Sequence, residues 1–96
     1  MKEYIRTEKF LVLTSIDNVG VALQDLKEGE KVHIREKEVI IKEKIEFGHK
    51  FAIKDIKKGE KIVKFGEIIG EAIKDIFEGQ HVHIHNIKSL RARRNE

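Results

Sequence analysis

Three histidines alternate near the end of the sequence, at His81, His83 and His85 within EGQHVHIHN. The chain has only five histidines, so this spacing is its first candidate for chemistry. On a strand the three rings would share one face, with neighbours about 6.5–7 Å apart and the outer pair about 13 Å apart. Two adjacent imidazoles could then bind one divalent ion at about 2.1 Å each. The alternative is a solvent-exposed face of an edge strand.

A metal site would need a further ligand from elsewhere in the chain. His49, in FGHK, is the only non-neighbouring histidine besides His33. His33 is expected to be exposed. Because imidazole binds many metals and geometry decides between them, the spacing permits a site without establishing one.

A repeat must position these residues. The segments VALQDLKEGEKVHI (21–34), FAIKDIKKGEKIVKF (51–65) and EAIKDIFEGQHVHIH (71–85) align without gaps. Each has an Ala, an Asp three positions later and a Gly four positions after the Asp. The Asp is expected to accept hydrogen bonds from backbone amides, and the Gly to adopt the positive φ of a tight turn.

Apolar residues alternate after each glycine, which predicts half-buried strands. In the last copy, Val82 and Ile84 are expected to face the core. The run KEVIIKEKIEF (37–47) predicts another strand. The segment EIIGEAIKDIF (67–77) has helical spacing, although its glycine weakens a helix. The pattern therefore predicts a mainly β protein with one or two short helical turns.

Length and composition narrow the class of protein. At 96 residues we expect a single domain over 1–96, and without cysteine it has no disulfide, thiolate metal site or thiol nucleophile. A charged fraction of 39%, rich in Lys and Glu, resembles proteins from hot environments. No apolar run could span a bilayer and no signal-like stretch opens the chain, so we expect a cytoplasmic protein without a membrane partner.

The C-terminal tail over 89–96 is basic, with Arg91, Arg93 and Arg94. Nucleic acid is not the expected partner, because no aromatic residues lie among the charges as single-strand binding would require. A solvated or partner-docking tail is the expected role.

Longer motifs give a family resemblance. The segments DNVGVALQDLKEGEKV (17–32), FGHKFAIKDIKKGEKIVKFGEIIG (47–70) and IFEGQHVHIHN (76–86) occur in the order found in the N-terminal domain of altronate dehydratases. The resemblance covers residues 10–88 and implies an SAF domain with a mainly β, β-clip fold. The wider family includes galactarate dehydratase and sulfolactate sulfo-lyase.

The resemblance also implies a function. In the family this domain precedes a much larger catalytic domain, and this chain stops at Glu96. We therefore expect the small subunit of a split hydro-lyase that dehydrates a sugar acid with a divalent metal, Fe²⁺ or Mn²⁺, and that is inactive without its large catalytic subunit. The alternative is a stand-alone SAF module that binds carbohydrate or protein without catalysis.

Individual positions carry over from the family motifs. His49 would be a metal ligand or an acid–base residue, and Lys50 a partner for the substrate carboxylate, so both are candidate catalytic residues. The predicted metal ligands are His49, His83 and His85. His81 is expected to be structural or solvent-facing.

The remaining candidates concern the substrate. Asp17 and Asn18 could bind substrate hydroxyls or organise the turn before a strand at 19–23. His83, His85 and Asn86 match the altronate-type ending, which galactarate-type relatives lack, and this implies a role in substrate choice or subunit docking; His83 and Asn86 are assigned to substrate binding. Phe65 replaces the usual Tyr, so any contact through that phenol is missing and the identity of the sugar acid stays open; Gly20 in place of the usual Ala is a minor change.

Overall fold

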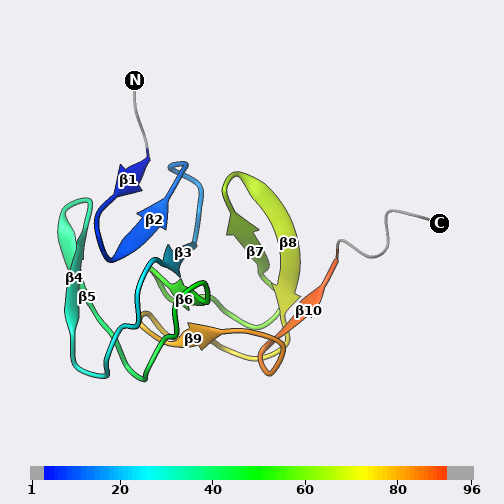
Figure 1. The fold of residues 1–96 in the computed structure, drawn as a ribbon. Helices are drawn as coiled ribbons and strands as arrows, with labels where there is room; N and C mark the ends of the chain where they lie inside the picture. Colours follow the sequence, from blue (N-terminus) through cyan, green and yellow to red (C-terminus); the bar gives the residue numbers. More distant parts are fainter. Residues whose placement is uncertain (1–3, 91–96) are drawn as a thin grey trace.

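The computed structural model describes residues 4–90, which form an all-β protein (Figure 1). The ten strands are β1 (Ile5–Arg6), β2 (Phe10–Val12), β3 (Val19–Ala22), β4 (Lys31–Ile34), β5 (Lys37–Ile40), β6 (Lys50–Ala52), β7 (Lys61–Lys64), β8 (Glu67–Ala72), β9 (His81–Val82) and β10 (Ile87–Ser89). The mainly β prediction is confirmed. The basic tail from Arg91 onward lies outside the described residues.

The strands form three antiparallel sheets. The largest has the order β1–β2–β3–β6–β9, the second has the order β10–β8–β7, and β4 and β5 form a hairpin of their own. In Figure 1 the β4–β5 hairpin and the β7–β8 hairpin stand on opposite sides of the five-stranded sheet. β9 is the edge strand of the five-stranded sheet and pairs with β6, and the candidate histidines lie on these two strands or close to their ends.

The expected helical turns are almost absent from residues 4–90. The segment with helical spacing forms β8 and the turn after it instead. The nearest approach to a helical turn follows β9, where the carbonyl of His83 accepts hydrogen bonds from the amides of Asn86 and Ile87 at 3.0 and 3.1 Å. Nothing in this part of the chain is a helix long and apolar enough to cross a membrane.

The repeat has four copies rather than three. Gly29, Gly48, Gly59 and Gly79 all adopt φ between 86° and 91°, the left-handed conformation that glycine allows. The additional copy covers 40–53 and has a lysine, Lys44, where the others have Asp. That substitution hides the copy in the sequence.

The four copies associate in two pairs. In each pair, the amide of the turn glycine donates to the carbonyl of the residue at the Ala position of the partner copy, at 2.7–2.8 Å. The Asp side chains do accept backbone amides, as predicted, but the amides belong to the partner copy: Asp55 accepts from Glu78 and Asp75 from Lys58, both at 2.9 Å. Hydrogen bonds therefore hold the turns together in pairs.

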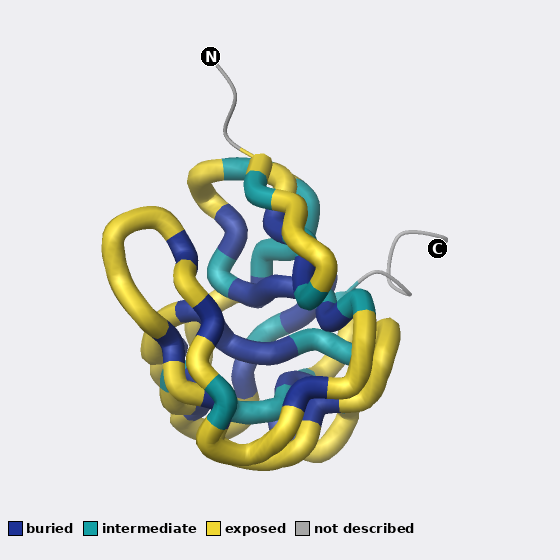
Figure 2. Tube along the Cα trace, turned by 60° about the vertical axis from the view of Figure 1, so that its left-hand side comes forward, coloured by how far each residue is buried: buried dark blue, intermediate teal, exposed yellow. Residues whose placement is uncertain are grey.

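Each pair of turns closes one hydrophobic core. The first core combines β2, the β4–β5 hairpin and one face of β6, and it contains Phe10, Val12, Ala22, Leu26, Val32, Ile34, Val39, Ile41, Ile45, Phe51 and Ile53. The second lies toward β7, β8 and β9, and it contains Val19, Ala52, Ile56, Ile62, Ile69, Ala72, Ile76 and Val82. Figure 2 shows these buried stretches inside and the turns exposed around them.

Candidate metal and substrate site

The pairing of β6 with β9 brings distant histidines together. The two strands are antiparallel, with Lys50 opposite Val82 and Phe51 opposite His81. Extending this register by one residue sets His49 beside His83. Residues that are more than 30 positions apart in sequence thus become cross-strand neighbours.

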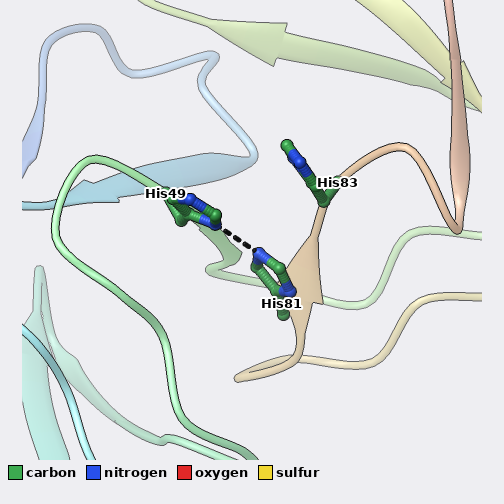
Figure 3. A group of neighbouring side chains, drawn as sticks. All are labelled: His49, His81 and His83. Carbon is green, nitrogen blue, oxygen red and sulfur yellow. Dashed lines mark hydrogen bonds between the residues drawn. The ribbon is translucent and has the colours of Figure 1, made fainter.

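Three imidazoles converge at this place (Figure 3). One ring nitrogen from each of His49, His81 and His83 lies within 4.8 Å of the other two. His49 Nδ1 and His81 Nε2 are 2.9 Å apart, and the ring centroids of the three pairs are 5.0–5.4 Å apart. All three side chains are partly exposed, so a ligand can reach them from solvent.

This group differs from the predicted ligand set by one residue, since it contains His81 and lacks His85. The expectation that His81 is merely structural or solvent-facing does not fit this position. The reason is that the strand ends at Val82, so the alternation does not continue. The chain turns back, Ile84 is 79% exposed instead of facing the core, and the ring of His85 comes to 5.3 Å from that of His81 rather than about 13 Å.

Asn86 holds the turn that carries these histidines. Its side chain is 3% exposed. Its Oδ1 accepts from the His83 amide at 2.9 Å, and its Nδ2 donates to the His81 carbonyl at 2.8 Å. Both polar groups of the side chain are thus used inside the protein, so the structure places Asn86 as a residue that positions the histidines rather than one facing a substrate.

The surroundings favour neutral imidazoles. Burial lowers the pKa of His81, and the neighbouring histidines lower it further, while Glu43 opposes the shift. Burial also lowers the pKa of His83, helped by the charges of His49 and Lys50. Metal ions bind the deprotonated imidazole, so this environment suits a metal ligand.

The spacing also fits a divalent ion. His49 Nδ1 and His81 Nε2 form a hydrogen bond of 2.9 Å (Figure 3). This distance is close to the roughly 3.0 Å between two ligands that bind one ion at about 2.1 Å and at the right angle of an octahedral site. The third imidazole lies within the same small volume. Among the described residues, these three form the one group of histidines and carboxylates with such spacing.

Lys50 lies next to this group on β6. Burial lowers the pKa of its ammonium, and the nearby charge of Lys64 adds to the effect. Within residues 4–90 no carboxylate forms an ion pair with Lys50. An ammonium that is partly buried and lacks a protein partner is suited to pair with the carboxylate of a ligand.

Asp17 and Asn18 lie in a different part of the fold. Asp17 is 3% exposed, and its carboxylate accepts hydrogen bonds from the Leu13, Thr14 and Gly66 amides and from the Thr14 hydroxyl. Asn18 donates to the Lys61 carbonyl and accepts from the Val63 amide, both at 2.8 Å. Both side chains therefore organise the β2–β3 loop and fasten it to the β7–β8 hairpin, which is the structural alternative stated above.

A hollow of about 620 Å³ lies beside that loop, between it and the tip of the β4–β5 hairpin. Its lining includes Ile16, Asp17 and Arg35 but no histidine. This hollow is thus separate from the histidine group, whose three side chains are partly exposed.

The hydrogen bonds of Asp17 make a stability prediction. Burial opposes ionisation, but the Thr14 hydroxyl and three backbone amides outweigh it, so the pKa of Asp17 lies below its ordinary value. The carboxylate therefore stabilises the fold above the ordinary pKa of about 3.9, and this contribution disappears as the pH falls through the lowered value. Asp17→Asn turns one acceptor oxygen into a donor facing other donors, and should lower the free energy of unfolding by about 2–4 kcal/mol at pH 7.

Urea unfolding of the wild type and of Asp17→Asn at pH 7 and pH 3 measures this effect. The difference between the two proteins should be large at pH 7 and smaller at pH 3, because pH 3 lies below the ordinary pKa and protonation of Asp17 in the unfolded chain then removes part of the advantage of the ionised folded form. An equal difference at both pH values would show that ionised Asp17 is not the stabilising form.

Comparisons with known proteins agree with this architecture. The family described as the altronate/galactarate dehydratase SAF domain matches residues 8–90. The chain is 42% identical to altronate dehydratase of Escherichia coli (strain K12) over 84% of its own length, and 40% identical to that of Bacillus subtilis (strain 168) over 85%. Each match spans only 16% of the relative. The (2R)-sulfolactate sulfo-lyase subunit alpha of Paracoccus pantotrophus is 45% identical over 49% of this chain and 70% of that subunit. The chain therefore belongs to the altronate/galactarate dehydratase SAF domain family.

Proposed function

We propose that this chain is the small subunit of a metal-dependent hydro-lyase that removes water from a sugar acid, and that a larger chain completes the active site. The observation that carries the proposal is the convergence of His49, His81 and His83 in a member of the dehydratase SAF domain family. Relatives named as dehydratases and as a sulfo-lyase subunit support the class of reaction, which is elimination from a hydroxy acid.

The need for a partner is supported by the lengths of the relatives. The altronate dehydratases contain a further 84% of sequence beyond the part that this chain matches. The sulfo-lyase relatives, of which the matches cover 54% and 70%, are named as alpha subunits. A domain of this family can thus occur as a separate subunit, and the partner proposed here corresponds to the remainder of an altronate dehydratase.

The residues of this chain would have distinct roles in the reaction. His49, His81 and His83 would hold a divalent cation, Fe²⁺ or Mn²⁺, which when bound supplies positive charge to the carboxylate and to the developing enolate. Lys50 would pair with the substrate carboxylate. Elimination takes the proton beside the carboxylate and releases the β-hydroxyl as water, so a proton carrier is also needed. The exposed ring of His85, 5.3 Å from His81, is the imidazole left for that role.

Reconstitution tests the proposal. The purified chain alone, supplied with Fe²⁺ or Mn²⁺, should not dehydrate altronate or galactarate. The large chain is the polypeptide from the same genome that matches the rest of altronate dehydratase. Adding it should produce turnover of a sugar acid, which is measured as formation of the 2-keto product. Turnover by the isolated small chain would contradict the split site, and a mixture inactive on every sugar acid and on sulfolactate would favour the binding-module alternative.

A further inference from the structure

The two most exposed large hydrophobic residues of the described part lie close to members of the histidine group in the sequence. Nine large hydrophobic residues in the described part of the chain are exposed, and Ile84 at 79% and Phe47 at 66% rank highest. Ile84 lies between His83 and His85, and Phe47 lies two residues before His49. Among the other large hydrophobic residues in 4–90, the highest exposed fraction is 63%, at Ile16.

Hydrogen bonds fix the backbone at both residues. The turn around Ile84 is fixed by the two Asn86 side-chain bonds and by the two amides that donate to the His83 carbonyl. The amide of Phe47 donates to Asp25 Oδ1 at 2.9 Å. Full burial of such a side chain is worth about 1.5–3 kcal/mol relative to exposure, so a rigid backbone that keeps both in water forgoes this stabilisation in the isolated chain.

We propose that Ile84 and Phe47 are the anchors by which this chain docks onto its large partner, with the histidine group enclosed between them. The inference rests on the proposed function and names the surface that the partner covers. The occupant is the polypeptide that corresponds to the 84% of altronate dehydratase outside the matched region. Its contact surface would carry two apolar pockets around a polar centre.

A protein partner fits these side chains better than the substrate does. A sugar acid offers hydroxyls and a carboxylate, which gain nothing from an exposed isoleucine or phenylalanine. In protein interfaces, in contrast, a few buried anchor residues contribute most of the binding free energy, and the contacts around them exclude water. Excluding water would also strengthen the interactions of a charged substrate with Lys50 and the histidine group.

The test measures the dissociation constant between the full chain and the large chain from the same genome, by calorimetric titration. Ile84→Lys should weaken binding at least 30-fold, because a charge would enter an apolar pocket. Ile84→Ala, which only shortens the side chain, should weaken it about tenfold. The matched control is Ile16→Lys on the β2–β3 loop, also highly exposed, which should change binding less than threefold. Thermal unfolding of all three variants should stay close to the wild type.

The outcomes separate the two proposals. If the wild type does not bind the large chain, the proposed function fails and the docking surface fails with it. If the wild type binds and forms active enzyme while both Ile84 variants bind as tightly as Ile16→Lys does, the small-subunit function stands and the docking surface is wrong. Should Ile84→Lys alone unfold, the Ile84→Ala result decides.

Discussion

Alanine in place of His49 or His81 should lower the affinity of the isolated chain for Co²⁺ at least about 100-fold, since even loss of an outer residue that supports a metal ligand costs 10–100-fold. His49 Nδ1 and His81 Nε2 are only 2.9 Å apart, so the two nitrogens would be adjacent ligands of one ion. Removing either leaves two imidazoles, and the geometry gives no reason to rank one above the other. The visible absorption of Co²⁺ during titration measures the affinity without any enzymatic assay.

His85 and His33 provide the controls. The family motifs assign His85 to the metal and leave His81 as structural or solvent-facing, whereas the structure groups His81 with His49 and His83 and leaves His85 outside. His85→Ala should therefore change Co²⁺ affinity less than about fivefold, yet lower turnover of the assembled enzyme if it carries the proton. His33 is exposed on β4, opposite Glu38, and His33→Ala should change neither quantity. A large loss of affinity in His85→Ala, with none in His81→Ala, would restore the ligand set that the family resemblance implies.

The sequence predicts most strands because their alternation reflects a buried and an exposed face. Val32 and Ile34 are buried on β4 as expected, and the strand predicted at 19–23 is observed over Val19–Ala22. Alternation fails at Ile84 because it cannot signal where a strand stops. The information lies instead in Asn86, whose side chain bonds the backbone at His81 and His83 and bends the chain.

The candidate site was only partly predictable from the sequence, because contacts between distant residues bring its members together. His49 lies beside the C-terminal histidines because of the register between β6 and β9. This register pairs residues more than 30 positions apart, and no local sequence pattern indicates it. Asp17 and Asn18 also illustrate the limit. Their motif matches the family, and Leu13 and Thr14 supply local hydrogen bonds to the Asp17 carboxylate. The bond from Gly66 to Asp17 and both bonds of Asn18 join residues more than 40 positions apart, which the sequence does not reveal.

Replacing Gly79 by alanine is expected to destabilise the fold far more than replacing Gly59, its counterpart in the preceding copy. Gly79 and Gly59 both have φ of 91°, so alanine is strained equally at both. They differ in their surroundings: a Cβ on Gly59 would meet nothing within 4 Å, whereas one on Gly79 would lie 2.0 Å from the Ile40 carbonyl oxygen. Gly59→Ala should therefore lower the free energy of unfolding by about 1–2 kcal/mol, the cost of the left-handed conformation. Gly79→Ala should lower it by more than about 4 kcal/mol, because backbone must move.

The same close approach connects the stability of the fold to the site. Beyond Ile40, the Lys42 amide donates to the Gly79 carbonyl at 2.9 Å, and Glu43 Oε2 accepts from the His81 amide at 3.1 Å. Moving the 40–43 segment away from Gly79 would thus displace His81 as well. In urea unfolding and Co²⁺ titration, Gly79→Ala should lose both stability and metal affinity, while Gly59→Ala loses a little stability and keeps its metal affinity. Equal stability losses in the two variants would mean that the 40–43 segment can move away from Gly79 at little cost. The histidine group would then not depend on the contact between Gly79 and Ile40.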